Sequence, residues 1–432
     1  MKKIVLGIIA FVLATGITAC SPPPPGSGLL DAADGSVEIR VFSNLPDRTG
    51  GQGLVEQMIF DDYMRKNPGI TLSVETLDDE AYKIKFKAYA SGSNMPDLVS
   101  VWGQPGFISE IIEAGLLEEL DETDYADYGF IEGSLDGFRS ADGGLYGLPR
   151  NTDVSGIYYN KALFDRYGWE VPATFGDLLV LCGQVRGAGF APIAIDGADK
   201  WPLSIFYHDM LTKYCGRDTA ALYTRAMNSC DFASDPAFLD MAALFQDSAA
   251  LLFQSGFETQ GYGTARDCFV SGQSAMYYAG SWNMSMAGDE GVAPDIRKNI
   301  RVFTMPPLTD SAKGAKDIAA WFGGGHSVTS AGKEKEEALK LLAFLYRPEN
   351  WSRIAWENNI CMSAQDFAQY KTGSETPVQL EFIDVVQNTA SISGTPLNDC
   401  GTAQFKTQCE NMLQSLTTSM ITPGEFVAGL GK

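Results

Sequence analysis

Between residues 37 and 101 the chain alternates short strand-like segments with amphipathic ones. Residues 37–42 place apolar side chains at every second position, a period that predicts a strand. The helical segment that follows ends at Asn67-Pro68-Gly69, because proline cannot continue a helix. Strand–helix alternation at this spacing is typical of parallel strands covered by helices. The expected strands are residues 37–42, 70–77 and 97–101, and the expected helices are residues 54–66 and 82–90.

The rest of the chain continues this pattern with more helix and no repeat of fixed period. A length of 432 residues predicts two or three domain-sized cores, so we expect an α/β protein with two lobes. Because ligands of parallel sheets bind beyond the carboxyl ends of the strands, functional side chains are expected at residues 43–45 and 102–104. Further strands are expected at residues 156–159, 193–195, 274–278 and 300–305, and further helices at residues 175–185, 201–212, 237–253 and 334–345.

The charge balance limits the partners of this chain. It has 54 aspartates and glutamates against 32 lysines and arginines, a formal net charge of −22. Such an acidic surface disfavours nucleic acid and anionic membrane faces, because both are negatively charged. The sequence has two histidines, His208 and His326, too few for a zinc site that needs several imidazoles. We expect neither a metal nor a cofactor.

The first 35 residues have the composition of an export signal followed by a tether. Two lysines precede an apolar run at residues 4–13, and small residues then lead to Cys20, an order typical of a secretory signal peptide. The ending ITAC resembles the lipobox of bacterial lipoproteins, which implies that residues 1–19 are removed and that Cys20 is lipidated. Residues 20–35, rich in proline and glycine, would then form a lipid-anchored tether. This predicts an extracytoplasmic location, on a cell surface or on the periplasmic side of a membrane.

Seven cysteines follow Cys20, an odd number, so not all of them can pair within one chain. Export permits disulfide bonds, and we expect one structural disulfide among them. Cys215 with Cys230, or Cys400 with Cys409, would close a short loop, and the sequence leaves the choice open. No CxxC spacing occurs, which disfavours zinc or redox chemistry.

Five motifs follow the tether. They are the first strand with Asn44, NMPDLVSVWG (residues 94–103), GLYGLPRNTDVSGIYYNKALFDRYG (144–168), SGQSAMYYAGSWNM (271–284) and WFGGGHSVTSAGKEKEEALKLLAFLYRPENW (321–351). Each is weak alone. In this order and spacing, the chain resembles the extracellular solute-binding proteins of bacterial ABC sugar importers, the branch that includes maltose-binding protein.

The resemblance implies a type II periplasmic-binding-protein-like fold, in which two α/β lobes, each a mixed sheet flanked by helices, close on a hinge around the ligand. Crossings between the lobes would fall near residues 149–153, 322–325 and 347–355. The glycine triplet Gly323–Gly325 suits a hinge, although a tight turn or close packing would also account for it. The implied N-terminal lobe is residues 36–149 and 322–350, and the C-terminal lobe is residues 150–321 and 351–432.

Four tryptophans are candidates for contact with a sugar. A sugar ring has apolar C–H faces that stack on flat aromatic side chains, and a rim of hydroxyls that pairs with planar polar groups. Each candidate is equally compatible with an ordinary core aromatic, the interpretation that we give to Trp351 and Trp356. The candidates are Trp282 and Trp102, which follow predicted strands, Trp321, which precedes the glycine triplet, and Trp201, which opens a predicted helix.

Polar partners for the hydroxyls are expected from strand ends and from the crossings. A guanidinium or a carboxylate at the first crossing can bind two neighbouring hydroxyls, although an ion pair or a turn cap is the alternative. Asp79 and Glu80 open a helix and are interpreted as its caps, with Glu80 kept as a candidate. The polar candidates are Asn44, Asp47, Glu80, Arg150, Asn151 and Asp153, with Gly323 and Gly324 beside them.

The sequence thus predicts a monomeric, non-catalytic protein that captures a carbohydrate outside the cell and delivers it to the membrane permease of an ABC importer. It would touch the membrane through its lipid anchor only and would not bind nucleic acid. A secreted carbohydrate-active hydrolase is the alternative, but the chain has no GxSxG, HExxH, P-loop or GxGxxG motif. A lipoprotein adhesin or a binding protein for another polar solute are further alternatives. The sequence leaves the identity and length of the sugar open.

Overall fold

The computed structural model of the chain describes residues 36–92, 94–309 and 313–432. The predicted signal peptide, Cys20 and the tether before residue 36 lie outside the described residues. Residues 37–432 form one compact unit. Within the described residues, the strands form two five-stranded sheets and one two-stranded sheet.

The first sheet is mixed, with three parallel strands at one side. Strand β1 pairs in parallel with β2 and β3, as the strand–helix alternation predicts, while β11 runs antiparallel to β3 and β4. The strand order is β2 (Ile70–Thr76), β1 (Val37–Ser43), β3 (Leu98–Trp102), β11 (Gly324–Val328) and β4 (Leu148–Pro149).

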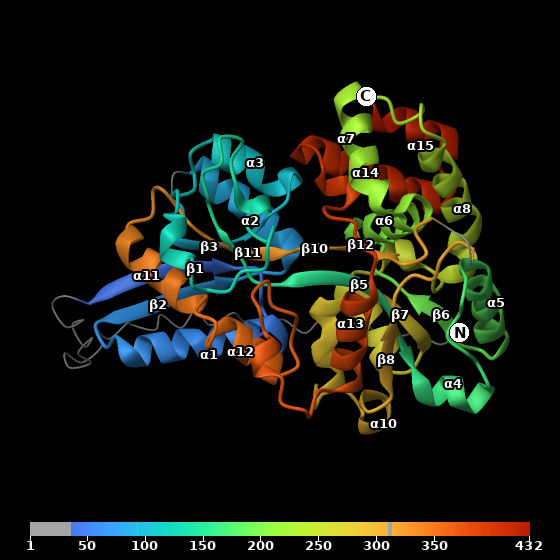
Figure 1. Cartoon of the computed structure of the whole chain (residues 1–432), viewed down its shortest axis with the longest axis horizontal. Coiled ribbons are helices and arrows are strands. Elements are labelled where there is room, and N and C mark those ends of the chain that lie inside the picture. The colour runs from blue at the N-terminus through green and yellow to red at the C-terminus, as the bar shows by residue number, and fades with distance from the viewer. Residues whose placement is uncertain (1–35, 93, 310–312) are drawn as a thin grey trace, which may run out of the picture. The chain divides into compact units, whose positions relative to one another are not determined.

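Helices cover both faces of this sheet (Figure 1). On one face lie α2 and α3, and on the other lie α1 and α12. The buried side chains of these strands and helices form one apolar cluster, the first core, which includes Ile39, Phe60 and Trp351. The helices are α1 (Gly51–Lys66), α2 (Asp79–Ser91), α3 (Pro105–Glu113), α11 (Lys335–Leu345) and α12 (Trp351–Glu357).

The second sheet is built around β5, the longest strand of the described residues. Strand β5 is antiparallel to β7, β8 and β10, and β6 pairs in parallel with β7. The strands are β10 (Ala320–Phe322), β5 (Thr152–Asn160), β7 (Ser274–Gly280), β6 (Ala191–Ala194) and β8 (Ile300–Phe303); the two-stranded sheet is β12 (Ser391–Ile392) with β9 (Asp317–Ile318).

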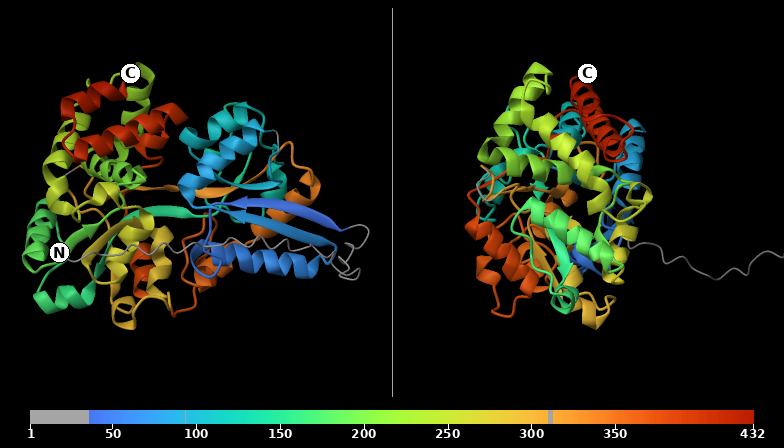
Figure 2. Two further views of the ribbon diagram at one scale, coloured as in Figure 1. Left: turned by 180° about the vertical axis from the view of Figure 1, so that it is seen from behind. Right: turned by 90° about the vertical axis from the view of Figure 1, so that its right-hand side faces the viewer.

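Helices α6, α8, α14 and α15 gather on one side of the second sheet, and α13 and α10 lie on the other (Figures 1 and 2). Each layer has its own buried cluster, the second core with the large helices and the third core with α13. The helices are α4 (Lys161–Tyr167), α5 (Phe175–Gly187), α6 (Trp201–Cys215), α7 (Thr219–Ser229), α8 (Pro236–Leu252), α9 (Tyr262–Val270), α10 (Pro294–Arg297), α13 (Pro377–Asn388), α14 (Ala403–Thr417) and α15 (Pro423–Leu430).

The chain passes between the two large sheets at two short segments. Arg150 and Asn151 join β4 to β5, and Gly323 joins β10 to β11. Both points fall inside the segments where the sequence predicts crossings. Two sheets linked by crossings of the chain have the mixed α/β architecture expected from the sequence. The exact residue bounds of the two lobes remain a proposal.

The sequence predicts the third crossing between the lobes at residues 347–355, but α12, which begins in this segment, packs within the first lobe. Helix α12 contacts α1, and Trp351 and Ala355 belong to the first core. Further along, Gln365 donates from its Nε2 to the carbonyl oxygens of Tyr128 (2.8 Å) and Tyr346 (2.7 Å). We therefore propose that the third crossing follows Gln365, so that α12 belongs with the N-terminal lobe.

The cysteines correct one expectation. All seven that the structure describes are free, so the predicted disulfide between Cys215 and Cys230 or between Cys400 and Cys409 is wrong. Cys182 and Cys361 are fully buried, and burial raises the pKa of each of these two thiols to about 12. Such cysteines act as small apolar side chains. Among the described residues, no helix is both long and apolar enough to cross a membrane.

Candidate ligand-binding site

Three of the candidate residues lie at or just after the carboxyl ends of strands in the two sheets. Asn44 follows β1, Trp102 ends β3, and Trp282 follows β7 in a short 3-10 helix, Ser281–Ala287. Asp153 and Trp321 face each other in register between β5 and β10. The strand-end rule therefore accounts for Asn44, Trp102 and Trp282, while Asp153 and Trp321 come from the strands beside the crossing segments.

Three of the four candidate tryptophans lie in a row. The ring centroids of Trp201 and Trp282 are 6.0 Å apart and T-shaped, and those of Trp282 and Trp321 are also 6.0 Å apart. Trp201 and Trp282 are half-buried, whereas Trp321 is 7% exposed. We call Trp201, Trp282 and Trp321 the tryptophan row. Trp351 and Trp356 are buried in cores, as the sequence predicts.

Trp102 lies apart from this row in its contacts. Its ring meets Phe107 at 4.9 Å and Tyr82 at 5.8 Å, both edge-on, and Lys83 Nζ lies 5.4 Å from the ring centroid. Its backbone pairs with Gly324, which keeps it near the second crossing. Trp102 is half-buried and packs against first-lobe side chains, so its role as a stacking residue remains a prediction.

Arg150 links the first crossing to the end of β1. It is 4% exposed, and its Nη1 donates to Asn44 Oδ1 at 3.1 Å. Asn44 Nδ2 in turn donates to Asp79 Oδ1 at 2.8 Å. Asp79 is therefore joined to the site, although the sequence reasoning interprets it as a helix cap. The cap of α2 is instead Asp78, whose side chain accepts from Ala81 N.

Glu80 lies outside this group. Its carboxylate pairs with Lys83 at 2.6 Å, and its side chain is 47% exposed. An exposed i, i+3 pair in a first helical turn is an ordinary surface feature. Asp47 caps a turn, because its Oδ1 accepts from Thr49 N (2.9 Å) and Gly50 N (3.0 Å). Although partial burial opposes it, these bonds and the charge of Arg266 lower the pKa of Asp47.

The glycine triplet is explained by close approach of polar side chains. A Cβ on Gly323 would lie 1.8 Å from Asp153 Oδ2, and one on Gly324 would lie 2.6 Å from Arg150 Nη2. None of the three glycines has a positive φ. Asn151 Nδ2 donates to Asp153 Oδ1, and burial raises the pKa of Asp153 to about 7 despite the nearby charge of Arg150.

A small cavity lies behind the tryptophan row, inside the second lobe. It holds about 10 Å³, at the limit for one water molecule. Asp196, which follows β6, and Trp282, which follows β7, reach it from neighbouring parallel strands. We call this cavity the aromatic pocket; the lining residues used below are Asp196, Trp201, Tyr262, Tyr277 and Trp282.

Sequence reasoning missed Asp196, Tyr262 and Asn283, whose Nδ2 donates to Tyr262 OH at 2.7 Å. Asp196 could have been found, because it follows a predicted strand and the strand-end rule applies there as well. Tyr262 gives no such signal. It opens α9, which only tertiary packing brings beside Trp201, at a ring distance of 6.0 Å.

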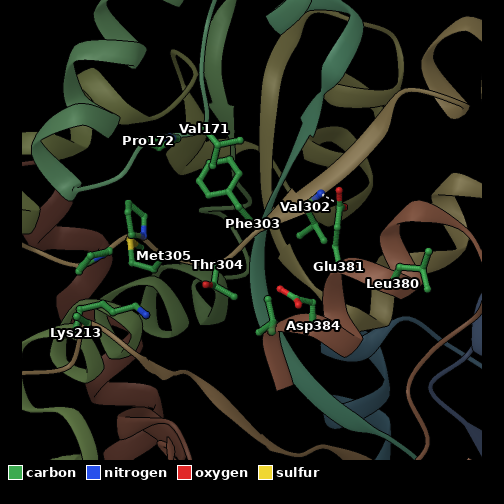
Figure 3. A pocket seen from close by; sticks show the side chains of 14 residues that line it. Val171, Pro172, Lys213, Val302, Phe303, Thr304, Met305, Leu380, Glu381 and Asp384 are labelled. Carbon is green, nitrogen blue, oxygen red and sulfur yellow. Dashed lines mark hydrogen bonds between the residues drawn. The ribbon is translucent and has the colours of Figure 1, made fainter. Parts of the chain in front are cut away.

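A larger cavity, of about 630 Å³, lies elsewhere in the second lobe (Figure 3). It runs between β8 and α13, where Glu381 Oε2 accepts from Val302 N at 2.8 Å. Its lining includes Phe303, Met305 and Leu380. No predicted site residue is among its lining residues, so its volume alone does not make it the candidate site.

The site leaves several buried polar atoms without hydrogen-bond partners. These atoms are Arg150 Nε and Trp282 Nε1, which are donors, Asn151 Oδ1, an acceptor, and Asp196 Oδ2. Buried polar atoms normally have partners, so a group of unpaired ones beside stacking rings suits a ligand with many hydroxyls. Unpaired buried atoms also occur elsewhere, such as Trp351 Nε1 in the first core. Among the described residues, no three His, Cys, Asp or Glu side chains could together hold a metal ion.

The sequence of the chain is similar to those of known proteins. The sequence profile of the family described as bacterial extracellular solute-binding protein matches residues 47–350. The multiple sugar-binding protein of Streptococcus mutans is 23% identical over 293 residues, which are 66% of this chain and 66% of that protein. The match thus spans about two thirds of that relative.

Solved structures with the same fold cover nearly the whole chain. A protein from a study of xylan utilization by Caldanaerobius polysaccharolyticus superposes with a TM-score of 0.82, at 22% identity, over 91% of this chain and 99% of its own. A chitin oligosaccharide binding protein superposes with a TM-score of 0.80, at 20% identity, over 92% of this chain and 97% of its own. These structures confirm the predicted two-lobed α/β fold.

Proposed function

The chain belongs to the bacterial extracellular solute-binding proteins, and on this premise we propose that it captures a carbohydrate outside the cell and delivers it to the membrane permease of an ABC importer. The observation that carries the proposal is the tryptophan row beside unpaired buried polar atoms. The names of a related multiple sugar-binding protein and of a similar chitin oligosaccharide binding protein support a carbohydrate as the ligand.

The proposed binding mode uses two kinds of contact. The indole of Trp282 stacks on the apolar face of a sugar ring, since it stands in the middle of the row and is half-buried. Arg150 Nε and Trp282 Nε1 donate to sugar oxygens, while Asn151 Oδ1 accepts from a hydroxyl. A neutral polyol supplies partners for both donors and acceptors, whereas a simple anion offers acceptors only.

The two lobes take part together in this mode. Arg150 lies at the crossing between the sheets and already contacts Asn44 of the first sheet. A ligand held by both lobes stabilises their closed arrangement, and we propose that the permease recognises this arrangement. The protein performs no bond making or breaking in this scheme. Lipidation of Cys20 would keep it beside the permease.

A thermal-shift screen of the purified chain against mono-, di- and oligosaccharides tests the proposal. We expect at least one carbohydrate to raise the unfolding temperature and to bind in the micromolar range, about −8 kcal/mol, in a calorimetric titration. Chromatography of the sugar after incubation should recover it unchanged. Failure of the whole panel to bind would overturn the carbohydrate proposal, and conversion of a sugar would favour the hydrolase alternative.

A further inference from the structure

From the second lobe we infer that the ligand carries an amino group, whose ammonium is held by Asp196, the member of the carboxyl pair Asp196–Asp199 that lines the aromatic pocket. The inference rests on the proposed carbohydrate function and narrows it to an amino sugar or an aminated oligosaccharide. It uses residues of a single lobe, so it does not depend on how far the two lobes close.

The size of the aromatic pocket excludes a sugar ring. Its free volume of about 10 Å³ admits one group of the size of a water molecule. A ring stacked on the tryptophan row would therefore insert only a substituent. A hydroxyl and an ammonium both have this size, and the chemistry of the pocket must decide between them.

The pocket has an acidic group with an unused oxygen. Asp196 is 2% exposed, and its Oδ1 accepts from Asp199 N at 3.0 Å, which closes a turn. Its Oδ2 has no partner. Asp199 does not line the pocket, but its Oδ2 accepts from the backbone N of Tyr262, which does, at 3.2 Å. The turn uses one oxygen of Asp196, and no donor among the described residues bonds to the other.

The carboxyl pair has no basic partner among the residues that line the pocket. The nearby basic side chains are bound elsewhere, since Arg266 pairs with Asp289 at 2.5 Å and Lys200 Nζ donates to Asn411 Oδ1 at 2.6 Å. Burial, together with the hydrogen bond and charge of Asp199, raises the pKa of Asp196 to about 8. Two adjacent carboxylates repel each other, which disfavours ionisation of both. A bound ammonium would offset this repulsion with its positive charge.

The walls of the pocket also favour a cation. The ring centroid of Trp201 lies 6.0 Å from that of Tyr262 and 6.0 Å from that of Trp282, and all three residues line the pocket. The faces of such rings attract an ammonium, most strongly where water is excluded. A hydroxyl would gain a single hydrogen bond from Asp196 and nothing from the rings. The net charge of −22 further attracts a cationic ligand toward the protein.

Calorimetric titration with matched sugars tests the inference. The probes are D-glucosamine, D-galactosamine, D-mannosamine and the chitosan disaccharide. Each is compared with its neutral hexose or disaccharide, in which a hydroxyl of similar size replaces the ammonium, and with its N-acetylated form, which loses the charge but adds an acetyl group. We expect at least one amino sugar to bind about tenfold or more tightly than both counterparts, because the counterparts lack the ion pair.

Asp196→Asn is the matched variant, because an asparagine Oδ1 can still accept from Asp199 N and keep the turn. We expect the preference for the amino sugar to fall to about threefold or less. Asp199→Asn serves as a second variant if the first folds poorly. Asp124→Asn, on an exposed 3-10 turn of the first lobe, removes the same charge away from the pocket and should leave the preference unchanged.

The outcomes separate the two proposals. Equal binding of amino and neutral sugars, or a preference that survives in Asp196→Asn, overturns the amino-group inference and leaves the carbohydrate function standing. If no amino sugar binds while another carbohydrate of the screening panel does, the inference falls and the function stands; if the whole panel fails, both fall. A preference that only Asp196→Asn or Asp199→Asn abolishes supports the inference.

Discussion

Glu56 in the first lobe and Asp196 in the second are both buried carboxyls, but their surroundings differ. In the first lobe, Glu56 is fully buried, yet its Oε1 contacts His326 Nε2 at 2.7 Å and its Oε2 pairs with Arg48. The other ring nitrogen of His326 contacts Tyr346 OH at 2.8 Å. We call these four residues the Glu56 network. In the second lobe, Asp196 is equally hidden from solvent, but one of its carboxyl oxygens has no partner.

The difference shows in the direction of the pKa shifts. Burial alone would raise the pKa of Glu56, but the hydrogen bonds and charges of His326 and Arg48 lower it to about 2. Burial raises the pKa of Asp196 to about 8 and that of Asp153 to about 7, because their partners compensate less. A buried carboxyl with complete partners stabilises the fold, whereas one with incomplete partners marks a place where a ligand can complete them.

The largest effect is expected from Glu56→Ala. Removal of this carboxylate leaves His326 and Arg48 without their shared partner, so the free energy of unfolding should fall by about 3–5 kcal/mol. Urea denaturation measures this change. Asp61→Ala, an exposed residue of the same helix, is the control and should change stability by about 0.5 kcal/mol or less. A loss below about 1 kcal/mol in Glu56→Ala would contradict the structural role of the network.

Acid should weaken the first lobe through the same carboxylate. The pKa of Glu56 is lowered in the folded state, so its contribution is present above pH 4.5 and is lost as the pH falls from 4.5 through 2. The full shift corresponds to roughly 3 kcal/mol. Denaturant titrations between pH 5 and pH 2.5 measure it, and Glu56→Gln should flatten the slope. An unchanged slope would show that other groups cause the acid loss.

The contribution of Asp153 to stability should depend on pH in the opposite direction to that of Glu56. Its pKa is raised in the folded state, so the folded protein is favoured below pH 3.8 and loses this advantage as the pH rises through about 7. Asp153→Asn removes the cost of ionisation and should stabilise the protein at pH 8 by on the order of 2 kcal/mol, with little change at pH 4. Urea midpoints at the two pH values test this. Equal effects at both would indicate that Asp153 does not ionise in this range.

The smallest change in energy is expected from Trp282, although it matters most for binding. Trp282→Ala should weaken carbohydrate binding about tenfold or more, which corresponds to about 1.4 kcal/mol, through the loss of stacking. Its unfolding temperature should change little, since the side chain is half-buried. Trp282→Phe keeps an apolar ring but removes Nε1, and should bind with intermediate affinity. Unchanged affinity in both variants would exclude Trp282 as the stacking residue.

Much of the fold could be predicted from local patterns. The period of two in β1 and the Pro68-Gly69 stop after α1 are local, and both predictions are confirmed within a few residues. The capping box at Thr422 and Glu425, whose pattern is visible in the sequence, also forms at the start of α15. The disulfide could not be predicted from spacing, because only the packing decides whether two thiols meet.

The candidate site was only partly accessible to such reasoning. Strand-end positions indicated Asn44, Trp102 and Trp282, and in the structure the rings of Trp282 and Trp321 are neighbours. They did not reveal that Asp79, rather than Glu80, joins Asn44, because the two are neighbours on one helix and differ only in the direction of their side chains. Asp199 and Tyr262 are 63 residues apart and meet through a hydrogen bond from the Tyr262 backbone N to the Asp199 carboxyl, which no sequence period predicts.

By itself the sequence determined the alternation of strands and helices, the acidic surface and the polar types available at the strand ends, because these depend on neighbouring residues and on composition. Only the tertiary structure decided which polar atoms are satisfied. Both oxygens of the buried Glu56 carboxylate have partners, whereas only one oxygen of the buried Asp196 carboxyl has a donor. That difference depends on side chains brought together from distant segments, and patterns among neighbouring residues do not predict such contacts.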